Sequence, residues 1–567
     1  MLGLPRHLGQ HSGGMIVCDR GLDAVVPLQP ATMPGRTVVQ WDKDDCEDLG
    51  IVKIDLLGLG MLAAMEDALR ICEIRGHPVD LARIPKDDPA VYDLLGRAET
   101  IGTFQVESRA QMATLPIMRP KCFYDLAIQV AIIRPGPIVG DLVHPYLNRR
   151  NGHEEIDYIH PLCQPILERT LGVPLFQEQV LRMAMEVAGF SGAEADELRR
   201  AMAFKRSDER MEKVSTKLLE RMSARHIPHE VQEKIVHSIG SFALYGFPES
   251  HSISFALIAY ASCWLKVHRG AEFFAGLINH QPMGFYSVHT LIQDAKRRGL
   301  RILAPSVCES DMETRVIDDS TLRLGLHRIK GLSTATGRRI IDERDRAPFL
   351  DLPDFLRRCT PSAAERRLLA KSGALNPLPA VAHRRDALWQ AELPLFDDLL
   401  SMTGASCSSP SRERPATGSP SNSLLPPMTP VERLTADFET QGASIGPHPM
   451  ALWRAASPLR LARARDLHDH PHGTRIEIGG MVICRQRPGT AKGHCFISLE
   501  DETGIANLFV PKKTYDLLRR VIVTENFLLG RGFVQRTEGD QPTVYITDIQ
   551  PLPATETPPA APAHNFH

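Results

Sequence analysis

The spacing of apolar residues changes along the chain, and each change predicts a different kind of element. In roughly the first 60 residues, apolar positions form short runs of strand length. From Met61 to about Leu300 they recur three and four residues apart, the period of a helix with one buried face. The strand predictions cover 13–17, 36–41 and 50–57, and the clearest helix predictions cover 61–76, 178–189 and 192–206. The last helix follows Ser191, and Glu194 lies three residues on, as in a capping box.

Further units follow towards the C-terminus. Residues 325–344 (GLHRIKGLSTATGRRIIDER) continue the helical pattern. From about Arg475 the period changes to two, and five or so short strands in about 75 residues predict a small β-barrel. The Ser-, Pro- and Thr-rich stretch at 400–431 predicts a flexible linker, and the Pro-rich end of the chain predicts a disordered tail.

Composition limits the class of protein. A chain of 567 residues predicts three or four domains, and 43% hydrophobic with 24% charged residues is typical of soluble globular proteins. The net charge of −2 gives no overall sign of a nucleic-acid partner, so any such site is local. Eleven cysteines without a CxxC pair favour reduced thiols in the cytosol. No apolar run reaches the ~18–20 residues that span a bilayer, and the start lacks an export signal.

The stretch LGIVKIDLLGLG, residues 49–60, places two charges in an apolar run. Residues two apart in a strand share a face, so Lys53 and Asp55 are expected to point together. The alternate residues are expected to point the other way, into a core: Val52, Ile54 and Leu56. A carboxylate beside a cation at a strand end suits a divalent metal ion and a phosphate ligand. Spacing alone favours a simpler alternative, a surface ion pair on an edge strand.

A second candidate is the basic end of the helix predicted at 192–206. Arg199 and Arg206 share one helical face, Arg200 is adjacent to Arg199, and Lys205 adds charge. Guanidinium groups bind phosphate through paired hydrogen bonds. A solvated basic face is the alternative, and charge alone favours it.

Several stretches, taken in order, resemble the bacterial C-family DNA polymerases, which comprise the replicative polymerase III α subunit and its error-prone relative. The resemblance runs from about residue 5 to 375 and resumes in the predicted barrel. YGFPESHS, INHQPMGFYS and RQRPGTAKG are more similar to the error-prone branch. Other matching stretches are HSGGMIV, VVQWDKDDCEDLGIVKIDLLGL, GTFQVESRAQM, AIIRPGPI, VHPYLNRRNG, VPLFQEQVLRMAMEVAGFSGAEADELRRAM, SISFALIAYASCWLK and GLHRIKGL.

The resemblance implies an α+β multidomain fold with a partial polymerase palm, a large helical fingers region, a helix-hairpin-helix and a C-terminal OB-fold β-barrel. The implied divisions are the C-terminal part of the palm, the fingers, the helix-hairpin-helix region, a linker with a clamp-binding peptide, the OB-fold and a disordered tail. Their ranges are, in that order, 1–60, 61–300, 301–376, 377–470, 471–552 and 553–567.

The resemblance also implies site residues. In the family the KxD strand belongs to the palm, and its Asp is one of three carboxylates that hold two metal ions. Asp55 is thereby assigned to catalysis and metal binding, and Lys53 to the neighbourhood of the triphosphate, with two Mg²⁺ ions as cofactors. The arginine pair, Arg199 and Arg200, is assigned to the incoming nucleotide. Lys205 and His251 are added as its neighbours, although a histidine opening an apolar helix is more often a cap or a hydrogen-bond anchor.

One expected part is missing from the sequence. Two-metal phosphoryl transfer needs several carboxylates converging on cations about 4 Å apart. In the family the other two come from a PDxDxDF segment upstream of the KxD strand, and these 567 residues contain no such segment. The chain is therefore expected to be a C-terminal portion of the polymerase that binds DNA far better than it catalyses.

The remaining basic candidates belong to DNA-binding units. In a helix-hairpin-helix, a tight turn brings backbone N–H groups to a phosphate without reading bases, but Ser333 replaces the usual second Gly here. A plain helical connector is the alternative. An OB-fold holds single strands with a basic groove and exposed aromatic rings, and Phe496 fits either such a platform or the barrel core. The DNA-binding candidates are Arg109, Arg134, Gly331, Arg338, Arg339, Arg485, Arg487 and Lys492.

QAELPLF, residues 390–396, resembles a short peptide that docks on a sliding clamp. Its anchoring residues are Gln390, Leu393, Leu395 and Phe396. The whole pattern predicts a cytoplasmic error-prone DNA polymerase that extends primer–template DNA with dNTPs during DNA repair. A sliding clamp and damage-response proteins are its expected partners, with no membrane. The alternative is a non-catalytic DNA-binding scaffold of fingers, hairpin and barrel.

Overall fold

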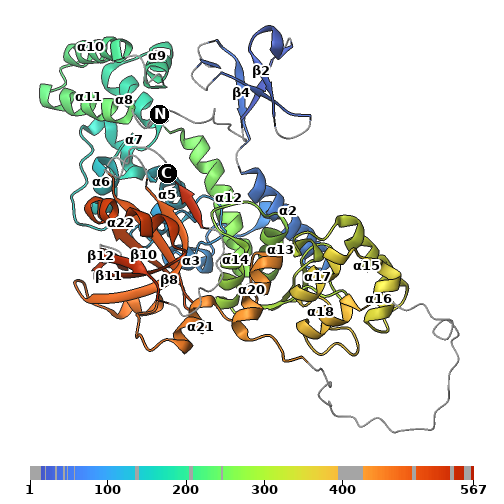
Figure 1. Cartoon of the computed structure of the whole chain (residues 1–567). Coiled ribbons are helices and arrows are strands. Elements are labelled where there is room, and N and C mark those ends of the chain that lie inside the picture. Colours follow the sequence, from blue (N-terminus) through green and yellow to red (C-terminus); the bar gives the residue numbers. More distant parts are fainter. Residues whose placement is uncertain are drawn as a thin grey trace, which may run out of the picture.

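The computed structural model describes most of the chain. The described residues are 14–18, 21–31, 35–41, 45–46, 49–56, 58–133, 140–203, 208–243, 247–393, 425–487, 493–536, 542–553 and 563–566. Separate parts are seen in Figure 1: an N-terminal lobe of short strands (blue), helices of the fingers (cyan to green), a helical lobe (yellow) and a C-terminal barrel (orange to red).

The N-terminal lobe contains two small antiparallel sheets, joined by η1 (Leu22–Ala24). The sheet strands are β1 (Gly14–Val17) with β4 (Val52–Asp55), and β2 (Leu28–Pro30) with β3 (Thr37–Val39). The three predicted strands are confirmed, and β2 is an addition. The expectation that the alternate residues around β4 enter a core is wrong, because Val52, Ile54 and Leu56 are exposed. A two-stranded sheet buries a face only where another element packs on it.

The centre of the helical region expected to form the fingers is built on α2 (Leu59–Ile74), α12 (Glu249–His268), α13 (Gly270–Asn279) and α14 (Val288–Arg297). α2 confirms the helix predicted at 61–76. Gly276 of α13 lies against α2, and a Cβ there would approach the carbonyl oxygen of Ala64 to 2.3 Å, so this helix contact needs glycine. The helices between α2 and the outer lobe are η2 (Leu81–Arg83), α3 (Pro89–Gly96), α4 (Arg109–Met118), α5 (Phe123–Ile132), α6 (Gly140–Arg150), η3 (Pro161–Cys163), α7 (Gln164–Leu167) and η4 (Glu168–Thr170).

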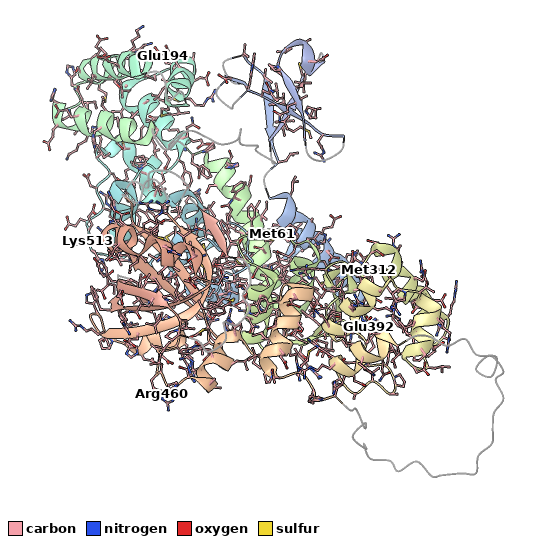
Figure 2. All side chains as sticks on the ribbon, in the orientation of Figure 1. Met61, Glu194, Met312, Glu392, Arg460 and Lys513 are labelled. Carbon is pink, nitrogen blue, oxygen red and sulfur yellow. The ribbon has the colours of Figure 1, made fainter. Side chains whose placement is uncertain are left out.

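The outer lobe of the fingers consists of α8 (Gln177–Ala188), α9 (Gly192–Ala203), α10 (Asp208–Ala224) and α11 (His229–Ala243). α8 and α9 confirm the other two helix predictions. The capping box is also confirmed, because the Ser191 N–H donates to Glu194 at 2.8 Å and the Glu194 N–H donates to Ser191 Oγ at 3.4 Å. Glu194, labelled in Figure 2, also binds Lys217 at 3.0 Å, and this ion pair joins α9 to α10.

The helical lobe follows a three-stranded sheet of β5 (Arg301–Leu303), β7 (Thr321–Arg323) and β6 (Arg315–Asp318). Its first elements are η5 (Leu326–Arg328), α15 (Thr334–Arg346), α16 (Leu352–Cys359) and α17 (Ala363–Ser372). The range 377–470, expected as a linker, contains α18 (Arg384–Glu392), α20 (Pro430–Gln441), α21 (Pro449–Ala456) and η6 (Arg465–Asp469). α18 forms because Ala387 and Ala391 are buried in the core of this lobe, and a capping box of Thr429 and Glu432 begins α20.

The C-terminal strands close into a five-stranded OB-fold barrel, as predicted. Its strands are β8 (Arg475–Gln486), β9 (Cys495–Glu500), β10 (Ile505–Val510), β11 (Phe527–Arg536) and β12 (Pro542–Pro551). The sheet runs β11-β12-β10-β9-β8, and the β11–β8 pairing closes it. α22 (Lys512–Thr524) connects β10 to β11 and was not expected. β13 (His564–Phe566) pairs with β8, so part of the expected disordered tail is a strand. Among the described helices, none has both the length and the apolar character of a membrane span.

Candidate nucleic-acid interface

One face of the barrel carries a row of aromatic rings. In β9, Ile497 and Leu499 enter the barrel core, while Phe496 is part-exposed on the outer side. Ring centroids are 5.5 Å apart for Phe496 and Phe509, 5.5 Å for Phe509 and Tyr545, and 4.8 Å for Tyr545 and Phe533. We call these four residues the aromatic ladder. Phe496 and Phe509 lie on β9 and β10, the second and third strands of the barrel. OB-folds bind oligonucleotides on the face formed by these two strands.

A cavity of about 870 Å³ is lined by residues of both the barrel and the fingers, and we call it the barrel–fingers groove. Its barrel side includes Phe496, Asn507, Phe509 and Thr543, and its basic residues include Arg97, Arg109, Arg298 and Arg465. Arg109, the first residue of α4, lies with its guanidinium carbon 4.6 Å from the centroid of the Phe496 ring. Burial lowers the pKa of Arg109 to about 10, so it remains a cation at neutral pH.

The groove combines the two features that hold single-stranded nucleic acid, stacking surfaces and fixed positive charge. Its arginines are partly neutralised within the chain, since Arg298 binds Glu99 at 2.9 Å and Arg97 binds Asp93 at 2.6 Å. Stacking on the ladder should therefore supply a large share of the affinity, and the dependence on salt should be modest.

Replacing Phe509 by Ala is expected to weaken binding of a single-stranded oligonucleotide about tenfold, because one stacked base contributes ~1–3 kcal/mol. Fluorescence anisotropy with a labelled oligothymidylate measures this change. Trp389→Ala is the matched control, since Trp389 is an exposed aromatic residue on α18, outside the groove. Equal affinities for Phe509→Ala and the unaltered chain would show that the ladder is not a stacking surface.

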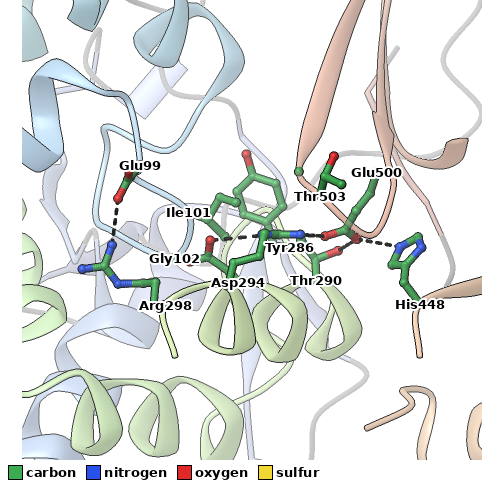
Figure 3. A network of polar contacts seen from close by, with 12 residues as sticks. Glu99, Ile101, Gly102, Tyr286, Thr290, Asp294, Arg298, His448, Glu500 and Thr503 are labelled. Atoms are coloured by element: carbon green, nitrogen blue, oxygen red, sulfur yellow. Dashed lines mark hydrogen bonds and ion pairs between the residues drawn. The ribbon is translucent and has the colours of Figure 1, made fainter. Parts of the chain in front are cut away.

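A buried polar network holds the barrel against the fingers. α14 presents Thr290 and Asp294 on one face, between the loop at 99–102 and β9 (Figure 3). Arg297 follows Asp294 by three residues and so shares this face. Lys266 of α12 has no exposed side-chain surface, and its Nζ donates to Asp294 at 2.8 Å and to the carbonyl oxygens of Glu99 and Ile101 at 2.9 and 2.6 Å.

Glu500 of β9 forms the barrel side of this network. Its fully buried carboxylate accepts hydrogen bonds from Thr290 Oγ1 at 3.0 Å and from both terminal nitrogens of Arg297 at 3.2 Å. The cost of burying a charge is offset only when it is paired and hydrogen-bonded. This network therefore fixes the position of β9, and with it the aromatic ladder, relative to the fingers.

Two buried histidines adjoin Glu500. Ligand-type atoms of His289, His448 and Glu500 lie within 4.8 Å of one another. His289 Nδ1 accepts the Ser444 N–H at 3.4 Å, and His448 Nδ1 accepts the Met450 N–H at 3.1 Å. A neutral ring that accepts at Nδ1 carries its proton on Nε2. The group therefore presents two N–H donors and a carboxylate to its centre, rather than the three lone pairs that a metal ion needs.

The lowered pKa values of these two histidines predict that the free energy of unfolding decreases in acid. Burial, with Lys296 and Arg297 nearby, lowers the pKa of His289 to about 3, and burial lowers the pKa of His448 well below its ordinary value. Stability from a lowered histidine pKa is present above the unfolded value of ~6.5 and is lost as the pH falls towards the folded value. For His289 alone, about 2 kcal/mol of unfolding free energy is expected to be lost between pH 8 and pH 5.

Urea unfolding followed by tryptophan fluorescence at both pH values tests this expectation. His289→Gln should flatten the dependence on pH, whereas His229→Gln, at a histidine whose side chain is 80% exposed, should leave it unchanged. The same loss between pH 8 and pH 5 in His289→Gln and in the unaltered chain would contradict the assignment.

Lys53 and Asp55 lie on β4, where the backbone pairs Lys53 with Ile16 and Asp55 with Gly14. Their side chains are outside the described part of the structure. On α9, Arg199 is exposed and its Nε binds Asp196 at 2.9 Å. Arg200 lies on the same helix by its backbone, and its side chain is not described. The assigned roles of both pairs stay predictions.

Other predicted residues fall outside the described ranges: Arg134, Lys205, Lys492, Leu395 and Phe396. His251 is described and lies in the first turns of α12, with its ring 5.0 Å from Phe247 and 4.2 Å from Phe255. Gln390 lies within α18, where its amide donates to the Ala380 carbonyl and to Asp386, and Leu393 is exposed directly after that helix.

The helix-hairpin-helix turn is formed at Gly331, whose φ is +83°. Glycine adopts this φ without strain, whereas a residue with a Cβ would be strained there. Two of its backbone donors already have acceptors within the chain. The Lys330 N–H donates to the Thr440 carbonyl at 2.7 Å, and the Ser333 N–H donates to Glu365 at 3.1 Å. Burial raises the pKa of Glu365, but hydrogen bonds from Ser362 and Ser333 outweigh it and lower the pKa to about 2. The ionised Glu365 carboxylate therefore already accepts the Ser333 N–H, a donor that a bound phosphate would otherwise use.

The basic residues of the hairpin and barrel differ in their availability. Arg338 is exposed on α15, whereas Arg339 donates to the Cys359 carbonyl at 3.0 Å and to Thr360 Oγ1 at 2.7 Å, at the end of α16. Arg485 is buried and donates to the carbonyl oxygens of Ile522 and Glu525, at the end of α22. Arg487 lies 4.4 Å from the centroid of the Tyr515 ring. Arg339 and Arg485 thus donate to carbonyl oxygens that have no partner within their own helix, and their assigned DNA-binding roles stay predictions.

Comparison with protein families gives four matches. Residues 61–226 match the bacterial DNA polymerase III alpha subunit finger domain, and residues 1–58 match the bacterial DNA polymerase III alpha NTPase domain. Residues 299–387 match a helix-hairpin-helix motif, and residues 476–552 match an OB-fold nucleic acid binding domain. The matches follow the order of the lobes in the structure.

Curated proteins align with this chain over nearly its whole length. The error-prone DNA polymerase of Anaeromyxobacter sp. (strain K) is 44% identical over 590 residues, which cover 100% of this chain and 50% of that protein. Those of Corynebacterium efficiens and Teredinibacter turnerae are 45% and 42% identical, covering 98% and 97% of this chain and 50% and 52% of those proteins. The chain spans about half the length of the curated relatives it matches.

Proposed function

The chain belongs to the bacterial C-family of DNA polymerases, and from this premise we propose that it takes part in template-directed DNA synthesis of the error-prone kind. The observation that carries the proposal is the barrel–fingers groove, where the ladder and arginines adjoin a finger domain of that family. The printed names of its relatives support the error-prone branch. Synthesis past damaged bases, in the cytoplasm, is the biological role we assign to it.

Different residues are proposed to contact the template, the incoming nucleotide, the duplex and the partner proteins. Unpaired template bases stack on Phe496 and Phe509 in the groove, and Arg109 adds a fixed cation beside them. Arg199, Arg200 and Lys205 on and after α9 bind the triphosphate of the incoming nucleotide. Arg338 contacts the backbone of the duplex without reading its sequence. A sliding clamp and damage-response proteins are proposed partners, with Gln390 and Leu393 at the clamp contact.

Polymerases of this family use divalent metal ions, and Asp55 is the residue that we assign to hold one, as Mg²⁺. Such an ion supplies electrostatic stabilisation of the charge that develops on the transferring phosphoryl group. One carboxylate on β4 does not complete a two-ion site, because each ion needs several oxygen ligands. The residues of this chain therefore fit part of the metal site, and we derive no step through the ions.

Primer extension tests the proposal against a non-catalytic DNA-binding scaffold, which the groove by itself would also support. The chain, with and without the half of the Anaeromyxobacter protein that it does not match, is mixed with primer–template DNA, Mg²⁺ and single dNTPs. Addition of the nucleotide complementary to the template is the expected result with both parts present. Tight binding of the same DNA without nucleotide addition in either mixture would favour the scaffold.

A further inference from the structure

The helix α22, which connects β10 to β11, has one face in the barrel core and one face in solvent. Tyr515 and Ile522 are buried in that core. On the other face, Leu517 and Val523 are 81% and 46% exposed. Among the large apolar residues that the structure describes, Leu517 is the most exposed. Packing on the barrel therefore accounts for Tyr515 and Ile522, but not for the outer apolar residues.

The outer face of α22 also carries four cations, and each is exposed: Lys512, Lys513 (labelled in Figure 2), Arg519 and Arg520. Within the described residues, the one ion pair that α22 forms joins Asp516 to Arg487 at 3.8 Å, so these four cations are not neutralised there. The two lysines begin the helix, where the positive end of the helix dipole disfavours them. A chain with a net charge of −2 thus gathers positive charge on this face, and no described ion pair offsets the repulsion among the four cations.

The chemistry of this face favours a protein partner over nucleic acid. None of the residues lining the barrel–fingers groove belongs to α22, so the cations of α22 are additional to those assigned to nucleic acid. A phosphate backbone would pair with the cations, but it has no apolar side chain to cover Leu517, and Asp516 would repel it. A protein segment that carries both carboxylates and apolar side chains matches the cations and the apolar residues together.

We propose that the outer face of α22 binds an acidic amphipathic helix of another protein. Carboxylates of that helix pair with the four cations of α22, and its apolar side chains cover Leu517 and Val523. These two residues lie between one and two helical turns apart along α22, a spacing that a second helix reproduces on its own apolar face. Binding at this face uses neither DNA nor nucleotide, so it is independent of the proposed function.

Isothermal titration calorimetry with the full 567-residue chain and two synthetic peptides tests the proposal. The acidic amphipathic peptide is a helix of about 14 residues, close to the length of α22, in which glutamates flank a face of leucines. The control peptide keeps the glutamates and replaces each leucine by serine. The amphipathic peptide is expected to bind with micromolar affinity, and the control peptide about tenfold more weakly, because it buries no apolar side chain.

Variants of the chain assign the binding to α22. Leu517→Ser should weaken binding of the amphipathic peptide about tenfold, because it removes the apolar contact. Lys513→Glu combined with Arg520→Glu should also weaken it about tenfold, because attraction becomes repulsion. Arg460→Glu is the matched control, at an exposed arginine that Figure 2 shows well apart from Lys513, and it should leave the affinity unchanged. All of these positions are exposed, so an unchanged midpoint of urea unfolding is expected and shows that each variant is folded.

Absence of binding by the amphipathic peptide, equal affinities of the two peptides, or equal affinities of Leu517→Ser and Arg460→Glu would overturn the proposal. Tighter binding of an oligothymidylate that Lys513→Glu with Arg520→Glu weakens would also overturn it, because phosphate would then be the ligand of this face. So would self-association of the chain that Leu517→Ser abolishes, since a second copy would then cover the face. Nucleotide addition plays no part in these measurements, so failure of the polymerase proposal would leave them unchanged.

Discussion

Replacing Asp294 by Ala is expected to destabilise the fingers by about 3–5 kcal/mol, because it leaves the fully buried Lys266 ammonium without its carboxylate. Lys266 Nζ would keep its hydrogen bonds to the carbonyl oxygens of Glu99 and Ile101, but the Asp294 carboxylate that balances its positive charge would be gone. Burial already lowers the pKa of Lys266, and Asp294 opposes that effect. Loss of the carboxylate therefore favours either local opening or deprotonation, and both cost free energy.

Hydrogen exchange of the α12 and α14 amides measures the change, because these helices carry the two residues. Asp93→Ala is the matched control, since its ion pair with Arg97 lies on the surface and such pairs contribute ~0–1 kcal/mol. A double replacement, Lys266→Met with Asp294→Ala, should recover part of the loss. Equal effects of Asp294→Ala and Asp93→Ala would show that Lys266 is not held as a charged group.

The regular part of the fold could be predicted from the sequence because local spacing determines it. The helical period identified α2, α8 and α9, and Ser191 with Glu194 gave the start of α9 correctly. Alternation identified the barrel strands, where apolar residues enter one core. α18, α20 and α21 were missed, since the composition of the stretch around them dominated the prediction, although Thr429 and Glu432 formed a recognisable capping box.

The candidate site was harder to predict, because its residues meet through distant contacts. Phe496 lies beside the RQRPGTAKG stretch and is predicted as a candidate, whereas no motif marks Phe509, Tyr545 or Phe533, although each occupies an outward position of an alternating strand. That alternation was the signal that could have found the ladder. No local signal marks Glu500 or Lys266, whose partners lie 210 and 28 residues away.

The arginines show a second limit of sequence reasoning. The resemblance to a helix-hairpin-helix and an OB-fold assigns Arg338, Arg339, Arg485 and Arg487 to DNA, and these roles stay predictions. In the structure Arg339 and Arg485 donate to carbonyl oxygens at helix ends, and Arg109 lies against an aromatic ring of the barrel. A guanidinium group can donate to a phosphate or to a carbonyl oxygen, so only the tertiary structure shows which acceptors lie within its reach.

Asp55→Asn is expected to reduce template-directed nucleotide addition by roughly 10²–10³-fold, because an amide cannot replace the carboxylate charge that a divalent ion needs. The substitution keeps the shape of the side chain, and DNA affinity should be unchanged, since the groove lies on other residues. Asp23→Asn is the matched control, at an exposed aspartate of the same lobe. It should leave both properties unchanged.

The central claim is that this chain contributes a catalytic carboxylate to a DNA polymerase. Single-turnover addition of one complementary dNTP, by the chain together with the half of the Anaeromyxobacter protein that it does not match, tests this claim most directly. The account predicts addition by the unaltered chain and by Asp23→Asn, and a loss of roughly 10²–10³-fold with Asp55→Asn at equal DNA occupancy. Addition at the same rate with Asp55→Asn would contradict it.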